Sequence, residues 1–200
     1  NVKVGISCVY EMLATLAFKN GEIINAEKLL IEAIERLIAD GIPEDDNQVV
    51  NFSMKLSRLY SSLKQDRLAE LGFKNCIMLQ KHKIKNGIKD EETGMLWISI
   101  LFWYGKFLLS RNRYDEAKTC LEWAYAASAQ VKSMLSTQIM VILYHLSEIS
   151  IAKHDYDGAL KCLFNAVILG KGTDNSDLPL YYVKIGTAYL HKGIYHQAKV

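Results

Sequence analysis

The stretch that decides the fold runs from residue 101 to residue 124 and reads LFWYGKFLLSRNRYDEAKTCLEWA. In its first half Gly105 directly follows Tyr104, and in its second half Ala117 is followed by Leu121 four positions later. Spacings of three and four place side chains on one face of a helix. A residue with little or no side chain lets two helices approach closely. The stretch therefore predicts two helices that cross where the small residues lie.

The same arrangement recurs along the whole chain. An alanine takes the position of Ala117 in four further copies, at Ala26, Ala69, Ala159 and Ala198. The copies match the W-x-x-L-G-x-x-Y…A-x-x-x-F layout of the tetratricopeptide repeat. The sequence therefore predicts an all-α fold, a right-handed superhelix (α-solenoid) of five helix pairs with the last pair truncated. Successive alanines are 43, 48, 42 and 39 residues apart, whereas the simple repeat has about 34, so the surplus lengthens either the helices or the connections.

We expect one domain over residues 1–200, because no long linker divides the chain. Its repeats are expected at about 7–40, 50–84, 98–131, 140–170 and 179–200. Turn-forming residues at 40–46, 86–90 and 170–175 indicate the connections between pairs. The chain has no initiator methionine and ends where a helix is expected to start, so we expect it to be an excised fragment.

Composition argues against several classes of function. Lys and Arg number 24 and Asp and Glu 22, so net charge gives no reason to expect a nucleic-acid partner. The four cysteines lie more than forty residues apart, which favours buried thiols over a metal site or a disulfide framework. No histidine is expected to have a carboxylate or cysteine at ligand spacing, and no phosphate-binding glycine loop is present. The chain is therefore predicted to bind no metal or cofactor and not to be an enzyme.

Two segments leave alternatives open. Residues 95–109 are almost entirely apolar and predict either a membrane span or, because the stretch is short and contains Lys106, a central helix covered on both sides. The basic run Lys81–Lys85 ends a predicted helix, where cations complement the helix dipole. Its alternative role is a patch for anionic lipid or an acidic partner.

The first helix of each pair is expected to bury one row of side chains against the second helix. A neighbouring row on the same helix is expected to line the concave face of the solenoid. It combines aromatic and cationic residues, a mixture enriched at protein-binding hot spots. The alternative is a groove that packs partly against itself. The predicted protein-binding residues are Phe18, Met54, Arg58, Phe102, Lys106, Tyr144 and Glu148.

Several segments beyond the repeat pattern resemble the tetratricopeptide repeat protein 19 family. They are Leu16-Ala17-Phe18 with Gly21, Asn25-Ala26-Glu27, Glu44-Asp45-Asp46-Asn47, Gly72 with Cys76-Ile77, and Gln197-Ala198-Lys199. The resemblance implies import into mitochondria and association with the inner membrane through a part that precedes Asn1. It also implies a non-catalytic role in assembly and maintenance of respiratory complex III, with complex III subunits, the Rieske iron–sulfur protein and its processing fragments as partners.

The alternative function is a cargo or scaffold adaptor that resembles kinesin light chain, whose repeats are likewise long, and that binds peptides in its concave groove. A third possibility is a chaperone cofactor that grips a C-terminal carboxylate. That function needs a clamp of Lys, Asn and Arg across three successive helices, and the predicted groove does not supply it. The oligomeric state is not predicted.

Overall fold

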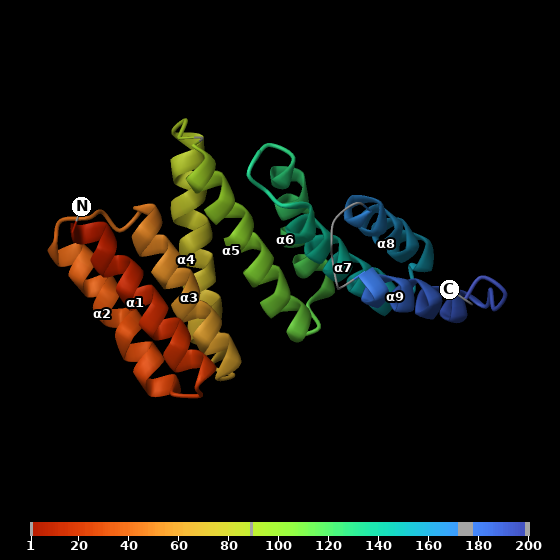
Figure 1. The fold of residues 1–200 in the computed structure, drawn as a ribbon, viewed down its shortest axis with the longest axis horizontal. Coiled ribbons are helices and arrows are strands. Elements are labelled where there is room, and N and C mark those ends of the chain that lie inside the picture. Colours follow the sequence, from red (N-terminus) through yellow and green to blue (C-terminus); the bar gives the residue numbers. More distant parts are fainter. Residues whose placement is uncertain (1, 89, 172–177, 199–200) are drawn as a thin grey trace. The chain divides into compact units, whose positions relative to one another are not determined.

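The computed structural model describes residues 2–88, 90–171 and 178–198, with side chains from residue 9 onward. These residues form α-helices and no strands, and the helices follow one another as a solenoid of antiparallel pairs (Figure 1). The predicted all-α solenoid is therefore confirmed. In order, the helices are α1 (Val2–Lys19), α2 (Ile23–Ala39), α3 (Asn47–Ser62), α4 (Asp66–Lys85), α5 (Glu91–Ser110), α6 (Tyr114–Ser128), α7 (Ser136–Ala152), α8 (Tyr156–Gly170) and α9 (Leu178–Lys192).

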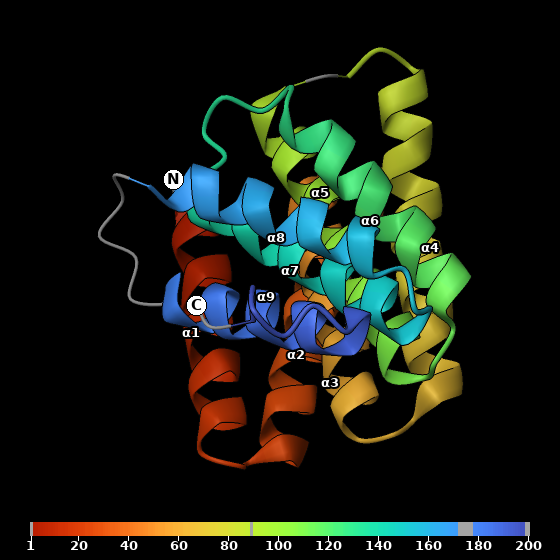
Figure 2. The same cartoon turned by 90° about the vertical axis from the view of Figure 1, so that its right-hand side faces the viewer.

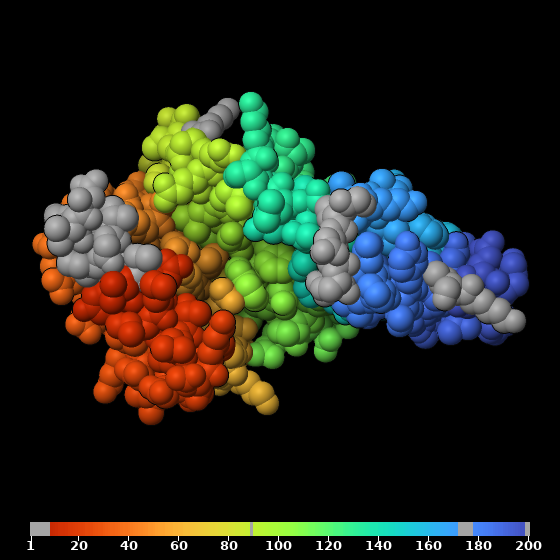
Figure 3. All heavy atoms as spheres, viewed as in Figure 1, coloured from red at the N-terminus to blue at the C-terminus, as the bar shows by residue number. Residues whose placement is uncertain are grey.

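The chain forms two compact units, residues 1–100 and residues 101–200, and α5 contributes to both. In the N-terminal unit α2 packs on α1 and α3, and α3 packs on α4 (Figure 1). In the C-terminal unit α7 packs on α6 and α8, and α8 packs on α9 (Figure 2). Within each unit side chains fill the space between the ribbons (Figure 3). The single domain over residues 1–200 stays a prediction.

Small residues occupy the crossings between paired helices, as the repeat pattern predicts. Ala26 is 1% exposed, and Ala69, Ala117 and Ala159 are fully buried. A Cβ atom added to Gly72 would lie 2.1 Å from Ser57 Oγ, and one added to Gly105 would lie 2.9 Å from Leu121 Cγ. Both glycines therefore let the facing helix come closer than any other residue would allow.

Each turn inside a pair has a left-handed residue five positions before the alanine. These residues are Gly21, Lys64, Asn112, His154 and Gly193, with φ between 57° and 81°. Two backbone hydrogen bonds close each turn, as in the first, where Glu22 N donates to Ala17 O at 2.9 Å and Gly21 N donates to Phe18 O at 3.1 Å. This is the Schellman motif, which satisfies the last carbonyl groups of a helix. The turns thus fix the same register in every pair.

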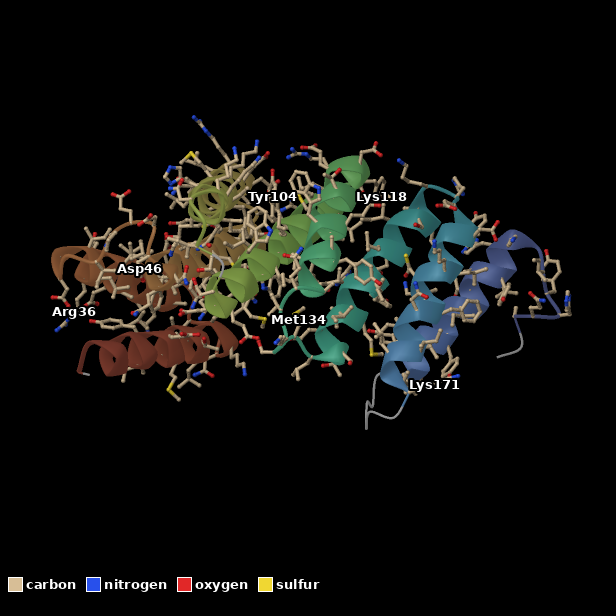
Figure 4. The ribbon with its side chains drawn as sticks, turned by 90° about the horizontal axis from the view of Figure 1, so that it is seen from above. Arg36, Asp46, Tyr104, Lys118, Met134 and Lys171 are labelled. Carbon is tan, nitrogen blue, oxygen red and sulfur yellow. The ribbon has the colours of Figure 1, made fainter. Side chains whose placement is uncertain are left out.

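The longest step, from Ala69 to Ala117, contains the two longest helices, α4 and α5, which have 20 residues each. α5 begins at Glu91 rather than near residue 98, because the Asp90 carboxylate accepts a hydrogen bond of 2.8 Å from Thr93 N and caps the helix. Asp46, labelled in Figure 4, caps α3 in the same way, with Gln48 N as donor at 2.8 Å. Residues 172–175 of the third predicted connection lie outside the described residues. Residues 195–197 form turns, where a second helix of the fifth pair was expected to begin.

Candidate functional site

The candidate site lies in the C-terminal unit, on α5, α7 and α9. On α5 the rings of Phe102 and Trp103 meet edge to face, with centroids 5.3 Å apart. The Lys106 Nζ atom lies 4.9 Å from the Trp103 centroid and 5.6 Å from that of Phe102, within range of a cation–π interaction. Tyr104 of the same helix, labelled in Figure 4, is buried. α5 thus presents two aromatic rings and one cation together.

α7 continues the cluster through a histidine. The His145 ring lies 5.6 Å from the Phe102 ring and 5.5 Å from the Tyr144 ring, centroid to centroid. Its Nδ1 atom is 2.9 Å from Glu148 Oε2. A carboxylate only accepts hydrogen bonds, so the Nδ1–H group of His145 donates this hydrogen bond to Glu148. His145 therefore joins the aromatic part of the site to its charged part.

α9 closes the cluster with a lysine. Lys184 Nζ lies 3.3 Å from Glu148 Oε1 and 5.2 Å from the centroid of the Tyr144 ring. The Tyr181 ring packs edge to face against Tyr144, with centroids 5.7 Å apart. The resulting surface, called the α5–α7–α9 site below, consists of Phe102, Trp103, Lys106, Tyr144, His145, Glu148 and Lys184.

Hydrogen bonding keeps both members of the Glu148–Lys184 pair charged. The pKa of Glu148 is lowered, mainly by the hydrogen bond from His145 and also by the charge of Lys184, although burial opposes the shift. For Lys184 burial acts to lower the pKa, but a hydrogen bond with Tyr144 and the Glu148 charge outweigh it, so the pKa is raised. The site therefore offers a fixed carboxylate and a fixed ammonium group beside its aromatic rings.

Four of the predicted residues, Phe102, Lys106, Tyr144 and Glu148, lie together in the structure, connected by His145 and Lys184. The expectation that no histidine has a carboxylate or cysteine at ligand spacing is wrong for His145, because Glu148 lies three positions later and within hydrogen-bond distance. The site also contains three residues that the sequence analysis did not predict, although they share a position in the repeat. Trp103, His145 and Lys184 all stand fourteen positions before the alanine of their pair.

The other three predicted residues, Phe18, Met54 and Arg58, belong to the N-terminal unit. Phe18 is 42% exposed, whereas Met54 is 4% exposed and packs in the core. The prediction of Met54 as a surface contact is therefore wrong, because this side of α3 is covered. Arg58 is half-buried, and burial lowers the pKa of its guanidinium group.

The neighbours of these three residues form a separate polar surface. Lys55 of α3 forms an ion pair with Glu11 of α1, and its Nζ atom lies 5.9 Å from the centroid of the Phe52 ring. Tyr60 Oη donates a hydrogen bond of 3.0 Å to Glu27 Oε1. These contacts tie α1, α2 and α3 together, so their first consequence is structural.

The basic run at the end of α4 is only partly available to a partner. Lys83 Nζ donates to Asn47 Oδ1 at 2.9 Å, and the buried Gln80 donates to the same oxygen at 3.0 Å. Asn47 in turn donates to the Thr93 hydroxyl at 3.0 Å. Lys83 therefore anchors the start of α3, while Lys81 and Lys85 stay exposed.

No group of three or more metal-ligating side chains occurs within the described residues. Among them, the thiols of Cys76 and Cys120 are buried, and burial raises their pKa values to about 12 and about 11. Among the described helices, α5 alone is long and apolar enough to cross a membrane. Half of its most apolar stretch is buried inside the protein. That burial favours the central-helix alternative.

No protein-family model matches the chain. The chain is similar over nearly its whole length to mitochondrial tetratricopeptide repeat protein 19. It is 24% identical to the mouse protein over 203 residues, which is 97% of this chain and 56% of that protein. It is 24% identical to the human protein over 98% of this chain and 54% of that protein, and 28% identical to the zebrafish protein over 81% and 43%. The chain thus spans about half the length of the curated relatives it matches.

Solved structures share the fold. The chain superposes on BtubC (BKLC) of P. vanneervenii with a TM-score of 0.80, at 16% identity, covering 98% of this chain and 78% of that one. It superposes on the tetratricopeptide-like repeats of a putative kinesin light chain of Podospora anserina with a TM-score of 0.76, at 17% identity, covering 96% and 89%. At these identities the likeness establishes the solenoid of helix pairs alone.

Proposed function

We propose that this chain is the protein-binding part of a mitochondrial factor for assembly and maintenance of respiratory complex III, the ubiquinol–cytochrome c reductase. The observation that carries the proposal is the similarity to tetratricopeptide repeat protein 19 over nearly the whole chain. The proposed partners are complex III subunits, including the Rieske iron–sulfur protein and the fragments left by its processing. The proposed location is the mitochondrial inner membrane.

The proposed role is binding rather than catalysis. Solenoids of helix pairs typically act as scaffolds or adaptors through their extended surfaces. In the α5–α7–α9 site Glu148 is paired with both His145 and Lys184, and the Lys106 ammonium group lies over the Phe102 and Trp103 rings. This arrangement fixes side chains for recognition, and it leaves no activated nucleophile within the described residues of the site.

The α5–α7–α9 site is the proposed contact surface. Its aromatic rings supply apolar area of the kind that dominates binding energy. Glu148 and Lys184 flank the rings and fix the orientation of a polar or charged segment. Because the residues come from three successive first helices, one extended or helical segment touches all of them at once. Phe18 and Arg58 remain proposed contacts of the N-terminal unit. Met54 is not a proposed contact, because its side chain is buried.

A quantitative pull-down tests the proposal. The tagged chain is incubated with mitochondria solubilised in digitonin, and recovered complex III subunits are measured by mass spectrometry. The Phe102→Ala, Tyr144→Ala double variant is expected to lose binding by at least about 30-fold, because aromatic anchors contribute about 2 kcal/mol or more. Tyr125→Ala on α6, also an exposed aromatic, is the matched control and keeps full binding.

Thermal unfolding followed by circular dichroism accompanies the pull-down. A double variant that stays folded and still recovers complex III would place the contact elsewhere. Recovery of no complex III subunit by the unmodified chain would refute the function itself.

The second candidate is a cargo or scaffold adaptor like kinesin light chain. The observation that favours it is the TM-score of 0.76 to a putative kinesin light chain, together with repeats longer than the simple form. The same pull-down, made from a whole-cell extract, separates the two functions. Recovery of a motor heavy chain in place of complex III subunits would support the adaptor.

A further inference from the structure

The outer face of α4 carries three exposed apolar side chains, which we call the α4 ridge. Leu68 is 46% exposed, Leu71 is 66% exposed and Met78 is 60% exposed. Their spacings of three and seven residues place them along one face of the helix. The C-terminal end of α4 is yellow-green in Figure 3. The opposite face of α4 carries the buried residues Ala69, Phe73 and Cys76, so the ridge plays no part in the core.

The repeat itself does not require these residues. At the register of Leu71 the other three complete pairs have polar side chains, and at that of Leu68 they have polar residues or glycine. These residues are Lys28, Thr119 and Lys161 for the first position, and Asn25, Glu116 and Gly158 for the second. Adjacent exposed apolar side chains on a soluble helix mark an interaction site more often than isolated ones do. Leu68 and Leu71 are therefore specific to this helix pair, whereas at the register of Met78 the fourth pair also has an exposed apolar residue, Ile168.

Basic side chains run beside the ridge along one flank. They are Arg67, Lys74, Lys81 and Lys85, all exposed, at spacings of seven, seven and four residues. Such spacings keep the four cations on one side of the helix. Lys74 Nζ lies 2.7 Å from Glu70 Oε1, and the side chain of Glu70 is 24% exposed. The flank therefore presents a row of positive charge that extends over the length of α4.

Acidic side chains border the other flank. The connection between α2 and α3 places Glu44 and Asp45 beside the C-terminal half of α4. Together with Met78, Leu79 and His82 they line an open hollow of about 380 Å³. The hollow has an apolar floor from Met78 and Leu79 and an acidic rim. The hollow is large enough to admit an apolar side chain from a partner.

We propose that the outer face of α4 binds an amphipathic α-helix of a protein partner. The apolar stripe of that helix packs on the α4 ridge, one of its large apolar side chains enters the hollow, and acidic residues along one edge face the basic flank. Helix-on-helix docking through such spaced anchors is a recurrent recognition mode. Opposite charges along the edge select the partner and its direction.

Charge argues for this occupant over two others. An anionic bilayer would meet Glu44 and Asp45 at the rim of the hollow, where like charges repel. A second copy of this chain would bring its own surplus of basic residues to the same face. A helix with acidic residues on one edge satisfies the basic flank along its whole length. The α4 surface is distinct from the α5–α7–α9 site and does not depend on the proposed function.

A pair of synthetic peptides tests the proposal. One is an 18-residue helical peptide with leucine at every third or fourth position and glutamate beside each leucine, and the other has lysine in place of every glutamate. Binding to the full chain is measured by fluorescence anisotropy at two salt concentrations. The glutamate peptide is expected to bind at least 10-fold more tightly than the lysine peptide, with a preference that falls as salt rises.

Two variants and two matched controls locate the contact. Leu71→Ser with Met78→Ser is expected to weaken binding of the glutamate peptide at least 10-fold, and Lys81→Glu with Lys85→Glu at least 3-fold. Ile24→Ser and Lys28→Glu are exposed substitutions on α2 of the same unit and leave binding unchanged. Phe102→Ala with Tyr144→Ala also leaves it unchanged, which separates this surface from the α5–α7–α9 site.

Three results would overturn the proposal. One is equal affinity for the two peptides, or binding that survives the serine variant. Another is sedimentation of the chain with vesicles of phosphatidylglycerol, lost in the serine variant, without any peptide preference. The third is a dimer in analytical ultracentrifugation that becomes a monomer when Leu71 and Met78 are replaced.

Discussion

Gly105→Ala tests the idea that a missing side chain sets the spacing between α5 and α6. The added Cβ atom would lie 2.9 Å from Leu121 Cγ, 3.1 Å from Leu121 Cδ2 and 3.5 Å from the Ala117 carbonyl oxygen. The first two distances are shorter than normal contact, and Leu121 is fully buried, so it has little room to move. Overpacking of this kind costs about 1–3 kcal/mol.

The same substitution also removes a glycine from a helix interior, which alone would stabilise the helix by about 0.5–1 kcal/mol. The net expectation is destabilisation by about 0.5–2 kcal/mol. Urea unfolding followed by circular dichroism measures the shift of the midpoint. The substitution lowers the free energy of unfolding only if the cost of overpacking exceeds the gain in helix propensity.

Leu121→Val supplies the control, because the shorter side chain makes room for the new Cβ atom. Alone it is expected to cost about 1 kcal/mol, but with Gly105→Ala the two effects should couple favourably by at least about 0.5 kcal/mol. Additive effects, or a Gly105→Ala chain more stable than the original, would mean that the close approach of α5 and α6 does not exist.

Three further predictions concern other parts of the molecule. The pKa of Glu148 is lowered by His145 and Lys184, so its contribution to stability is present above the ordinary pKa of 4.5 and is lost as pH falls through the lower folded value. The stability difference between the unmodified chain and Glu148→Gln, measured by thermal melts, should therefore shrink as pH falls from 7 to about 3, and a constant difference would contradict the pairing. Lys64 has φ of 58°, a left-handed conformation that glycine adopts more readily. Lys64→Gly should therefore raise the free energy of unfolding in urea by about 0.5–1 kcal/mol. If Lys64 had an ordinary helical conformation, the same substitution would lower it. The Cys76 thiol, with its pKa raised to about 12 by burial, should resist a thiol reagent at pH 8 until the chain unfolds, and rapid labelling of the native chain would disprove its burial.

The helix pairs could be predicted from the sequence because their signal is local and repeated. Each alanine has a left-handed turn five positions earlier and a large apolar residue four positions later in most copies. Helix starts were harder to predict. Asp90 was interpreted as part of a connection, although its carboxylate also caps α5 through Thr93, and an aspartate serves in turns and in caps alike.

The candidate site could be predicted only in part, because helical spacing identifies residues on one face of a helix but not which neighbouring helices cover that face. Met54 and Tyr144 stand at equivalent positions fifteen residues before their alanines, yet Met54 is buried and Tyr144 half-exposed. Contacts between distant residues were also out of reach. Nothing in the sequence near Lys83 indicates that its ammonium group binds Asn47, 36 residues earlier.

Some positions of the repeat fix the geometry of the helix pairs, and other positions supply the surface residues. The turns hold the pairs in register through backbone hydrogen bonds, and in the C-terminal unit ion pairs link one pair to the next beside them. Lys153 pairs with Asp115 and Lys192 with Asp157, so the same contact occurs twice. In the C-terminal unit these positions and the buried alanines fix the geometry, and the residues fifteen, fourteen and eleven positions before each alanine are partly exposed there. Those residues supply the α5–α7–α9 site, so substitutions there are expected to change binding with little effect on the fold.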